Sequence, residues 1–358
     1  MNLILITPRL TPDDPPLAFI PNRIINLASK IDKLWVITPR LKKITFPENV
    51  NIIEVGRDYS KGEEFSHALA NFHRNMQQIT KYERIDGLFT FMYPEYAILA
   101  FPYAWIKRIK LIMWYAHYQV NLRLILASTL VDKILTTSYE TCRIRSDKVN
   151  PIGQGIDTNT FRLYPEHRYH DPEKKIEITS VGRISPVKHL ETIIEAANIL
   201  VNHEGCDKLH FSFVGAPPIQ KHLDYKNLLQ SRVNNYGLEK YISFLGNIPH
   251  DQLPIYYQGI DFFVSSSLSG ADKAVFEAMS CEIPVLVSHP VFLEILKPYT
   301  DELIFEHNKP QTLANKLSHL ISIPYAERYL IGKSLREIVL LNHSIEQYSQ
   351  KIIDAFNC

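Results

Sequence analysis

The sequence predicts an α/β protein made of two doubly wound domains in series. Short apolar runs alternate with amphipathic helical patterns along most of the chain, which is typical of βαβ units and parallel sheets. This alternation begins a second time after an irregular segment at residues 158–174. The chain has 358 residues, of which 46% are hydrophobic and 22% charged, a composition that suits two globular domains with apolar cores.

In the first half, buried strands are expected to alternate with helices such as residues 63–80. The strand-like runs are residues 3–7, 33–38, 51–55, 86–91, 109–115 and 133–138. The second half repeats the pattern. Its strand-like runs are residues 175–183, 208–215, 241–246, 261–266, 283–288 and 302–306, with helical patterns near 188–203, 222–236, 271–281 and 310–322.

The domain boundaries follow from the break in this rhythm. Residues 158–174 contain two prolines and no apolar period, which indicates an interdomain linker. We therefore expect an N-terminal domain at residues 1–160, a C-terminal domain at 161–340 and a terminal helix at 341–358. The amphipathic pattern of this helix allows it to pack on either domain, including back on the N-terminal one. Ligands of open α/β sheets bind at the carboxyl ends of strands, so the two domains are expected to face each other across a cleft.

Charge and cysteine content narrow the classes of function. The net charge of +1 offers no general argument for a nucleic-acid partner. Residues 1–165 hold 21 Lys and Arg against 15 Asp and Glu, whereas the remainder holds 18 against 23. The basic first half indicates an anionic partner, although drift of surface charge explains it equally well. The four cysteines are far apart, and no apolar run resembles a signal peptide or a membrane span, so a cytoplasmic location is expected.

Two basic residues follow the first strand of the second half. Arg183 stands at the strand end, and Lys188 falls in the first turn of a helix expected to begin near Pro186. A lysine there opposes the helix dipole, and a bound anion would offset that cost. A solvated surface pair is an equally good interpretation of this spacing.

The stretch "SLSGADKAVFEAM" at residues 267–279 connects another strand to a helix. Gly270 permits unusual backbone angles, and residues 271–274 are expected to form a first helical turn whose N–H groups can hold an anion. The carboxylate of Glu277 can accept the hydroxyls of a ribose. With Arg183 and Lys188, these residues indicate a nucleotide-diphosphate site without a metal.

Two further segments follow strands. Gly215 and the segment 244–249, which contains Ile248, could bring backbone close to a ligand. A simple turn is the more common role of such segments.

The motifs of the second half resemble a known family. The segments "SVGRISPVKHLETIIEA", "FVGAP", "FLGNIPHDQLPIYYQGIDFFVSSS" and "FEAMSCEIPVLVS" resemble, in order and spacing, the C-terminal domain of family 4 glycosyltransferases of the GT-B fold. "NPIGQGIDTNTF" resembles the segment that leads into that domain, and the N-terminal half is similar only in strand order and in "WYAHY". The resemblance implies a retaining, metal-independent glycosyltransferase. Such an enzyme moves a sugar, here expected to be a hexose, from a UDP-type or GDP-type donor to a hydroxyl on a glycan or a lipid-linked glycan.

The resemblance also implies roles for single residues. Arg183 and Lys188 would neutralise the donor diphosphate, Glu277 would bind the ribose, and His117 would lie beside the transferred sugar. These residues form the implied catalytic set. The implied donor-binding set is Gly215, Ile248, Ser269, Gly270, Ala271, Asp272, Lys273, Ala274 and Glu277. No cofactor and no metal are implied, in agreement with the lack of an Asp-x-Asp motif in the sequence.

Three positions depart from the family pattern. Ser269 replaces the usual glutamate that contacts the donor sugar, and Asp272 replaces a second glycine. "TPRLTPDDPPLAFIP" takes the place of the glycine-rich loop after the first strand. The Asp272 carboxylate could accept sugar hydroxyls in place of the glutamate, and the Lys273 ammonium could reach phosphate or an acidic sugar.

A second partner is suggested by residues 101–123, which mix aromatic side chains with four basic ones. These are Lys107, Arg108, Lys110 and Arg123. Aromatic and basic surfaces bind anionic lipid headgroups, so peripheral binding to the inner face of a membrane is expected from the flanks of the core strand at 109–115.

Two competing functions stay open. A nucleotide-sugar epimerase shares the two-domain architecture. A non-catalytic partner protein is suggested by Ser269 and by the missing glycine-rich loop.

Overall fold

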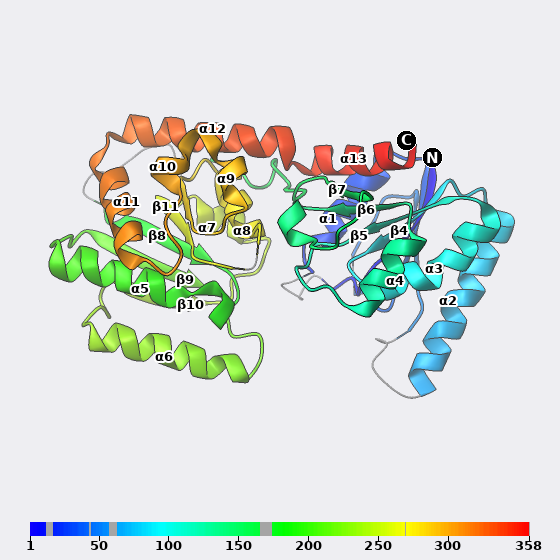
Figure 1. Ribbon diagram of the computed structural model, residues 1–358, viewed down its shortest axis with the longest axis horizontal. Coiled ribbons are helices and arrows are strands. Elements are labelled where there is room, and N and C mark those ends of the chain that lie inside the picture. The colour runs from blue at the N-terminus through cyan, green and yellow to red at the C-terminus, as the bar shows by residue number, and fades with distance from the viewer. Residues whose placement is uncertain (12–16, 43, 57–62, 165–173, 269, 358) are drawn as a thin grey trace. The chain divides into compact units, whose positions relative to one another are not determined.

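The chain folds into two compact α/β units. The computed structural model describes residues 1–357 except 12–16, 43, 57–62, 165–173 and 269. Unit 1 comprises Met1–Gly155 and Ser344–Cys358, and unit 2 comprises Ile156–His343. Each unit is a parallel sheet with helices on its faces, as Figure 1 shows.

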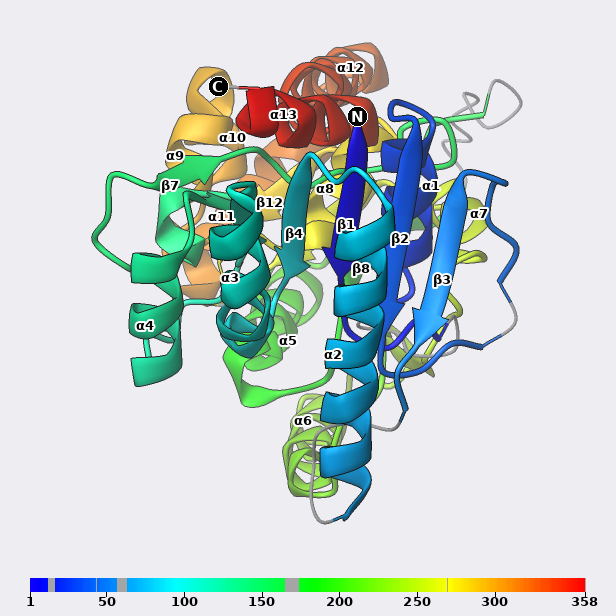
Figure 2. The ribbon, with the colours of Figure 1, turned by 90° about the vertical axis from the view of Figure 1, so that its right-hand side faces the viewer.

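Unit 1 contains a parallel sheet with the order β3-β2-β1-β4-β5-β6-β7. Figure 2 shows β3, β2, β1 and β4 side by side. The described elements are β1 (Asn2–Ile6), α1 (Ile20–Ala28), β2 (Lys33–Thr38), β3 (Val50–Glu54), α2 (Glu63–Tyr82), β4 (Gly87–Phe91), α3 (Pro94–Lys107), β5 (Lys110–Trp114), α4 (Leu122–Leu130), β6 (Lys133–Thr136), η1 (Tyr139–Thr141), β7 (Val149–Pro151) and α13 (Ile345–Asn357).

Side-chain alternation along the strands builds the two faces of this sheet. In β1, Leu3 and Leu5 belong to the core beneath α1 and α13, whereas Ile4 and Ile6 belong to the core beneath α2, α3 and α4. A strand that is buried on both faces reads as a continuous apolar run, which is why "LILI" predicts it. Helix α13 contacts α1 and therefore completes unit 1, although the rest of the chain's last third lies in unit 2.

Unit 2 contains a parallel sheet with the order β10-β9-β8-β11-β12. Its described elements are β8 (Ile176–Val181), η3 (Pro186–Lys188), α5 (Leu190–Asn198), η4 (Ile199–His203), β9 (Leu209–Val214), α6 (Lys221–Asn235), β10 (Ile242–Gly246), α7 (Leu253–Tyr257), β11 (Phe262–Ser265), α8 (Lys273–Ser280), β12 (Val285–Val287), α9 (Phe292–Ile295), η5 (Lys297–Tyr299), α10 (Thr300–Leu303), α11 (Pro310–Ser322) and α12 (Tyr325–Asn342). Strands β8 and β11 lie side by side in this sheet. The strands that follow them in the chain lie on opposite sides, because β9 neighbours β8 and β12 neighbours β11. Such a switch point is the usual ligand site of a doubly wound sheet.

The strand predicted at residues 302–306 is wrong. Thr300–Leu303 form the short helix α10, and only Ile304 makes a single parallel bridge, with Val287. The alternating apolar side chains are buried all the same, since Leu303 and Phe305 are 0% and 2% exposed. A short helix followed by one bridge buries these two residues as well as a strand would.

The linker predicted at residues 158–174 is also wrong over its first part, and residues 165–173 lie outside the described residues. Residues 158–164 pack into unit 2, where Phe161 is 2% exposed. The Arg336 guanidinium on α12 donates hydrogen bonds of 3.0 Å to the carbonyls of Phe161 and Thr158. A pattern of polar residues and prolines along the sequence does not reveal such contacts between distant segments.

Helix α12 packs so closely on the turn after α8 that it requires a glycine. A Cβ at Gly332 would lie 1.9 Å from the Glu282 carbonyl oxygen. We expect Gly332→Ala to destabilise unit 2 by about 1–3 kcal/mol through overpacking, even though alanine favours helices. Urea unfolding followed by circular dichroism measures this, with Lys333→Ala on the exposed side as the control. A more stable Gly332→Ala variant would show that helix propensity outweighs the close contact.

Candidate functional site

The candidate site lies at the switch point of unit 2. Strands β8 and β11 are hydrogen-bonded neighbours, with Ile178 opposite Phe262. Arg183 and Lys188 follow the carboxyl end of β8, and residues 270–274 follow the carboxyl end of β11. Because both ends meet at one edge of the sheet, the structure brings the two predicted segments together.

Lys188 does not lie in the first turn of an α-helix, as the sequence predicts. It ends the 3₁₀ turn η3, and α5 begins only at Leu190, after His189 in a left-handed conformation. Lys188 is 8% exposed. A Cβ at Gly182 would lie 3.2 Å from the Lys188 Cε and Nζ atoms, so the glycine leaves room for the lysine stem. The helix-dipole argument therefore does not apply to Lys188. Its burial is instead the reason to expect a compensating anion beside it.

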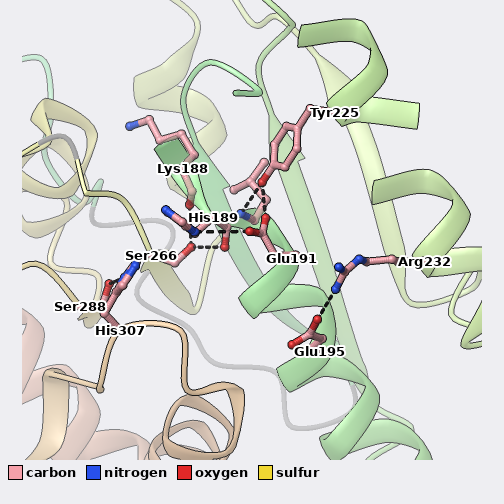
Figure 3. A network of polar contacts seen from close by, with 10 residues as sticks. Lys188, His189, Glu191, Glu195, Tyr225, Arg232, Ser266, Ser288 and His307 are labelled. Carbon is pink, nitrogen blue, oxygen red and sulfur yellow. Dashed lines mark hydrogen bonds and ion pairs between the residues drawn. The ribbon is translucent and has the colours of Figure 1, made fainter. Parts of the chain in front are cut away.

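A polar network holds the loop that carries Lys188. The Ser266 hydroxyl, just after β11, lies 2.8 Å from both the Lys188 and the His189 carbonyl oxygens. The Leu190 N–H donates to the Tyr225 hydroxyl at 2.9 Å, and that hydroxyl donates to Glu191. Figure 3 shows the Lys188 side chain pointing away from this network. The backbone is thus fixed from β11 and from α6, while the ammonium is directed elsewhere.

Helix α6 is anchored to α5 by a second contact, the ion pair of Arg232 with Glu195 (Figure 3). Burial, together with the hydrogen bond to Glu191, raises the pKa of the Tyr225 hydroxyl. This hydroxyl therefore stays protonated and keeps donating to Glu191 throughout the neutral range.

The Lys188 ammonium pairs with the Asp272 carboxylate. The two side chains are 10% and 15% exposed, so the pair is largely shielded from water. Asp272 is the N-cap residue of α8, and Gly270 precedes it with φ of 87°. Helix α8 begins at Lys273, two residues later than the first turn predicted at residues 271–274.

Lys273 and Glu277 form a second charged cluster with His250. The Lys273 ammonium pairs with the Glu277 carboxylate one helical turn further on. His250 Nε2 lies 2.9 Å from both Glu277 Oε1 and Lys273 Nζ. Burial raises the pKa of the Glu277 carboxyl, but the charge of Lys273 and the hydrogen bond with His250 outweigh it and lower the pKa to about 2. Glu277, which is 3% exposed, is therefore an anion at neutral pH.

His250 was not singled out from the sequence. It stands four residues after β10, directly beyond the predicted segment 244–249, and its ring packs on Phe161 with 5.4 Å between centroids. Its position just beyond a strand end is the signal that could have drawn attention to it.

Arg183 differs from the two lysines because it is exposed. Within the described ranges no hydrogen bond or ion pair involves its side chain. Two cations of the predicted site are therefore held by carboxylates, and the guanidinium is accessible to an incoming anion.

Gly215 has a structural role in this unit. A Cβ there would lie 1.9 Å from the Gly182 carbonyl oxygen, so the glycine allows the β8 and β9 ends to approach. Ile248 is partly buried against the core, Ala271 and Ala274 are buried, and Ser269 lies outside the described residues. Their contact with a donor stays a prediction.

His117 lies in unit 1, after β5, and is exposed. Its ring stacks on Tyr118 with 4.6 Å between centroids, and its Nδ1 accepts a hydrogen bond of 3.1 Å from the Gln119 N–H. The predicted role of His117 beside the transferred sugar stays a prediction.

The described part of the chain offers neither a cluster of metal ligands nor a helix that could span a membrane. Among these residues no group of three or more His, Cys, Asp and Glu side chains could hold a metal ion. No helix in the same part of the chain combines the length and the apolar character needed to cross a membrane.

The low pKa of Glu277 predicts an acid-dependent contribution to stability. Its folded pKa of about 2 lies below the ordinary 4.5, so the stabilisation is present above pH 4.5 and is lost as the pH falls toward 2. We expect Glu277→Gln to lower the free energy of unfolding at pH 7 and to approach the wild type as the pH falls from 5 to 3. Urea titrations at these pH values measure the gap, with the exposed Glu337→Gln as the control. A gap that is constant with pH would contradict the ion-pair assignment.

Known proteins share both the motifs and the fold. A model of the family described as glycosyl transferases group 1 matches residues 166–335. The amylovoran biosynthesis glycosyltransferase AmsK of Erwinia amylovora is 27% identical over 183 residues, which are 49% of this chain and 42% of that protein. Mannosylfructose-phosphate synthase of Agrobacterium fabrum is 25% identical over 173 residues, which are 46% of this chain and 37% of that protein. The match thus spans about two fifths of the length of these curated relatives.

The whole chain also has a structural counterpart. The crystal structure of Anabaena HepE in complex with UDP and glucose is 16% identical, covers 100% of this chain and 99% of its own, and has a TM-score of 0.75. This likeness confirms the predicted GT-B fold with its two Rossmann-like domains. The family motifs lie in unit 2, where residues 166–335 match the model of the glycosyl transferases group 1 family.

Proposed function

We propose that this protein is a retaining glycosyltransferase that transfers a sugar from a nucleotide-diphosphate donor to a hydroxyl acceptor. The observation that carries the proposal is the meeting of Lys188, Arg183 and the start of α8 at the switch point of unit 2. A nucleoside diphosphate leaves with growing negative charge, and preplaced cations stabilise that charge most effectively in a site shielded from water. A buried ammonium and an accessible guanidinium meet this requirement.

The donor is proposed to lie across the two charged clusters. Its diphosphate would contact Arg183 and Lys188, and the ribose hydroxyls would donate to Glu277, which is ionised at neutral pH. A UDP-type or GDP-type donor fits this arrangement, and the UDP complex of Anabaena HepE supports the first of these. The Lys273 ammonium contacts Glu277 and His250, and its contact with the donor stays a prediction.

The reaction exchanges one bond at the anomeric carbon for another and moves one proton. The acceptor hydroxyl oxygen bonds to the anomeric carbon of the sugar, and the bond from that carbon to the terminal phosphate oxygen breaks. We propose attack on the face that the diphosphate leaves, with a phosphate oxygen taking the hydroxyl proton, so the anomeric configuration is retained. Arg183 and Lys188 hold the departing charge, and no protein carboxylate forms a covalent intermediate. His117 is proposed to contact the transferred sugar.

Unit 1 is proposed to bind the acceptor, a glycan or a lipid-linked glycan, at an anionic membrane surface. The outer face of α4 exposes Leu122, Ile125 and Leu126, at 83%, 47% and 49%. At the end of the neighbouring helix α3, Trp105 and Ile106 are 73% and 67% exposed. Residues 93–148 hold eight Lys and Arg against four Asp and Glu. Apolar side chains among an excess of basic ones suit an anionic lipid surface.

The donor assignment predicts a specific ligand response. UDP, GDP or ADP, tested separately with the purified protein, should raise the melting temperature of the wild type by mass action. Lys188→Ala should weaken this shift and lower kcat about 10²-fold, because a buried charge-stabilising donor is lost. The exposed Lys240→Ala, which precedes β10 at the opposite edge of the sheet, is the matched control.

The outcomes of this experiment also separate the competing functions. A transfer product with the donor's anomeric configuration in NMR supports the proposal, and an inverted product contradicts retention. Isomerised donor in the absence of acceptor would identify an epimerase. Donor binding without turnover on glycan or lipid-linked acceptors would identify a non-catalytic partner.

The membrane assignment predicts that Leu122→Glu with Ile125→Glu reduces co-sedimentation with phosphatidylglycerol vesicles at low salt several-fold. A charge on the outer face of α4 costs free energy in the lipid interface. Ile255→Glu, at a 69% exposed apolar position on α7 in unit 2, should leave co-sedimentation unchanged. Equal loss with both variants, or no binding by the wild type, would contradict this surface.

A further inference from the structure

Asp272 is the N-cap residue of α8 but does not cap it. An aspartate at this position ordinarily accepts a hydrogen bond from a backbone N–H of the first turn. Here the side chain makes no such bond. It turns instead to the Lys188 ammonium, which comes from a loop 84 residues earlier in the chain. The residue type is therefore explained by its pairing with Lys188 and not by helix capping.

This pairing occupies the cation that the proposed diphosphate needs. Both side chains are at most 15% exposed, so neither is screened well by water. A phosphate group that approaches Lys188 meets the Asp272 carboxylate, and like charges repel strongly in a shielded site. The carboxylate and the diphosphate are thus competitors for the same ammonium.

No other cation of the site can replace Lys188 as the partner of Asp272 without a large cost in free energy. Lys273 is its neighbour in sequence, yet its ammonium pairs with Glu277 and contacts His250. Taking Lys273 away would leave the carboxylate of Glu277 buried, at 3% exposure, without its cation. Arg183 would itself pair with the incoming diphosphate and is therefore not available to Asp272.

We propose that Asp272 is an internal counter-ion of the donor site and selects the transferred sugar. In the empty site it neutralises Lys188. When a diphosphate takes Lys188, the carboxylate accepts hydrogen bonds from hydroxyls of the sugar, which is bonded to the terminal phosphate and therefore lies next to it. This inference rests on the proposed function of the site.

The chemistry of a carboxylate decides which sugars suit this position. A carboxylate only accepts hydrogen bonds, so it favours a group that is rich in hydroxyl donors. An acidic sugar would add a second anion beside Asp272 and is disfavoured. The structure thus assigns the site to neutral, polyhydroxylated sugars and against uronic acids.

The opposite effects of one substitution test this inference. Asp272→Asn should bind UDP, GDP or ADP, whichever the wild type binds, about tenfold more tightly, because the competing anion is gone. For the matching nucleotide hexose, the same variant should lose at least about tenfold in kcat/KM and should discriminate less against the nucleotide uronic acid. Isothermal titration calorimetry and steady-state assays measure these changes. Asp207→Asn, an exposed aspartate before β9, is the matched control for a lost surface charge.

The outcomes divide clearly. If the wild type binds a diphosphate and Asp272→Asn binds it no more tightly, Asp272 is a fixed structural ion pair and the inference is overturned. Tighter diphosphate binding with unchanged sugar preference would overturn the selecting role and keep the counter-ion role. If the wild type binds none of the three diphosphates, the proposed function itself fails, and the inference falls with it.

Discussion

The buried ammonium of Lys188 is the constraint on which the candidate site depends. A cation taken out of water must be compensated, and the cost of leaving it alone in the interior would be several kcal/mol. The structure meets this need in two ways. Gly182 leaves space for the aliphatic stem, and Asp272 supplies the opposite charge. The hydrogen bonds from Ser266 and to Tyr225 hold the loop so that the ammonium reaches its partner.

The charges of the site are divided into two separate clusters. Asp272 and Lys273 are adjacent in the chain but serve different partners, because Asp272 has an extended backbone just before α8 whereas Lys273 lies in the helix, one turn before Glu277. One turns to Lys188, and the other folds along the helix to Glu277. With Arg183, the site holds three cations against two carboxylates, and most of its charge is already paired before any ligand arrives. Binding at such a site is an exchange of ion pairs.

The two units differ in how much their sequences reveal. The family match at residues 166–335 falls within unit 2, where the proposed binding of a nucleotide diphosphate would demand a few charges and a helix start at fixed places. In unit 1 the informative feature is a surface. Exposed apolar side chains on α4 and at the end of α3 occur in a basic region, and such a surface has no fixed spacing along the chain.

The sequence by itself determined the fold class, most strands and the neighbourhood of Arg183, Lys188 and Glu277. Strands buried on both faces must be continuous apolar runs, and residues that follow adjacent parallel strands must meet at one sheet edge. The misread segments were ones whose burial a second local structure also satisfies, such as residues 302–306.

Only the tertiary structure decided which charge pairs with which. Lys188 and Asp272 are 84 residues apart, and His250 and Glu277 are 27 apart, so no periodicity along the chain encodes either contact. These pairings depend on the direction of side chains at loop ends and on the loss of water around them. Both are properties of the packed fold, because solvent is excluded only when distant segments close over the same place.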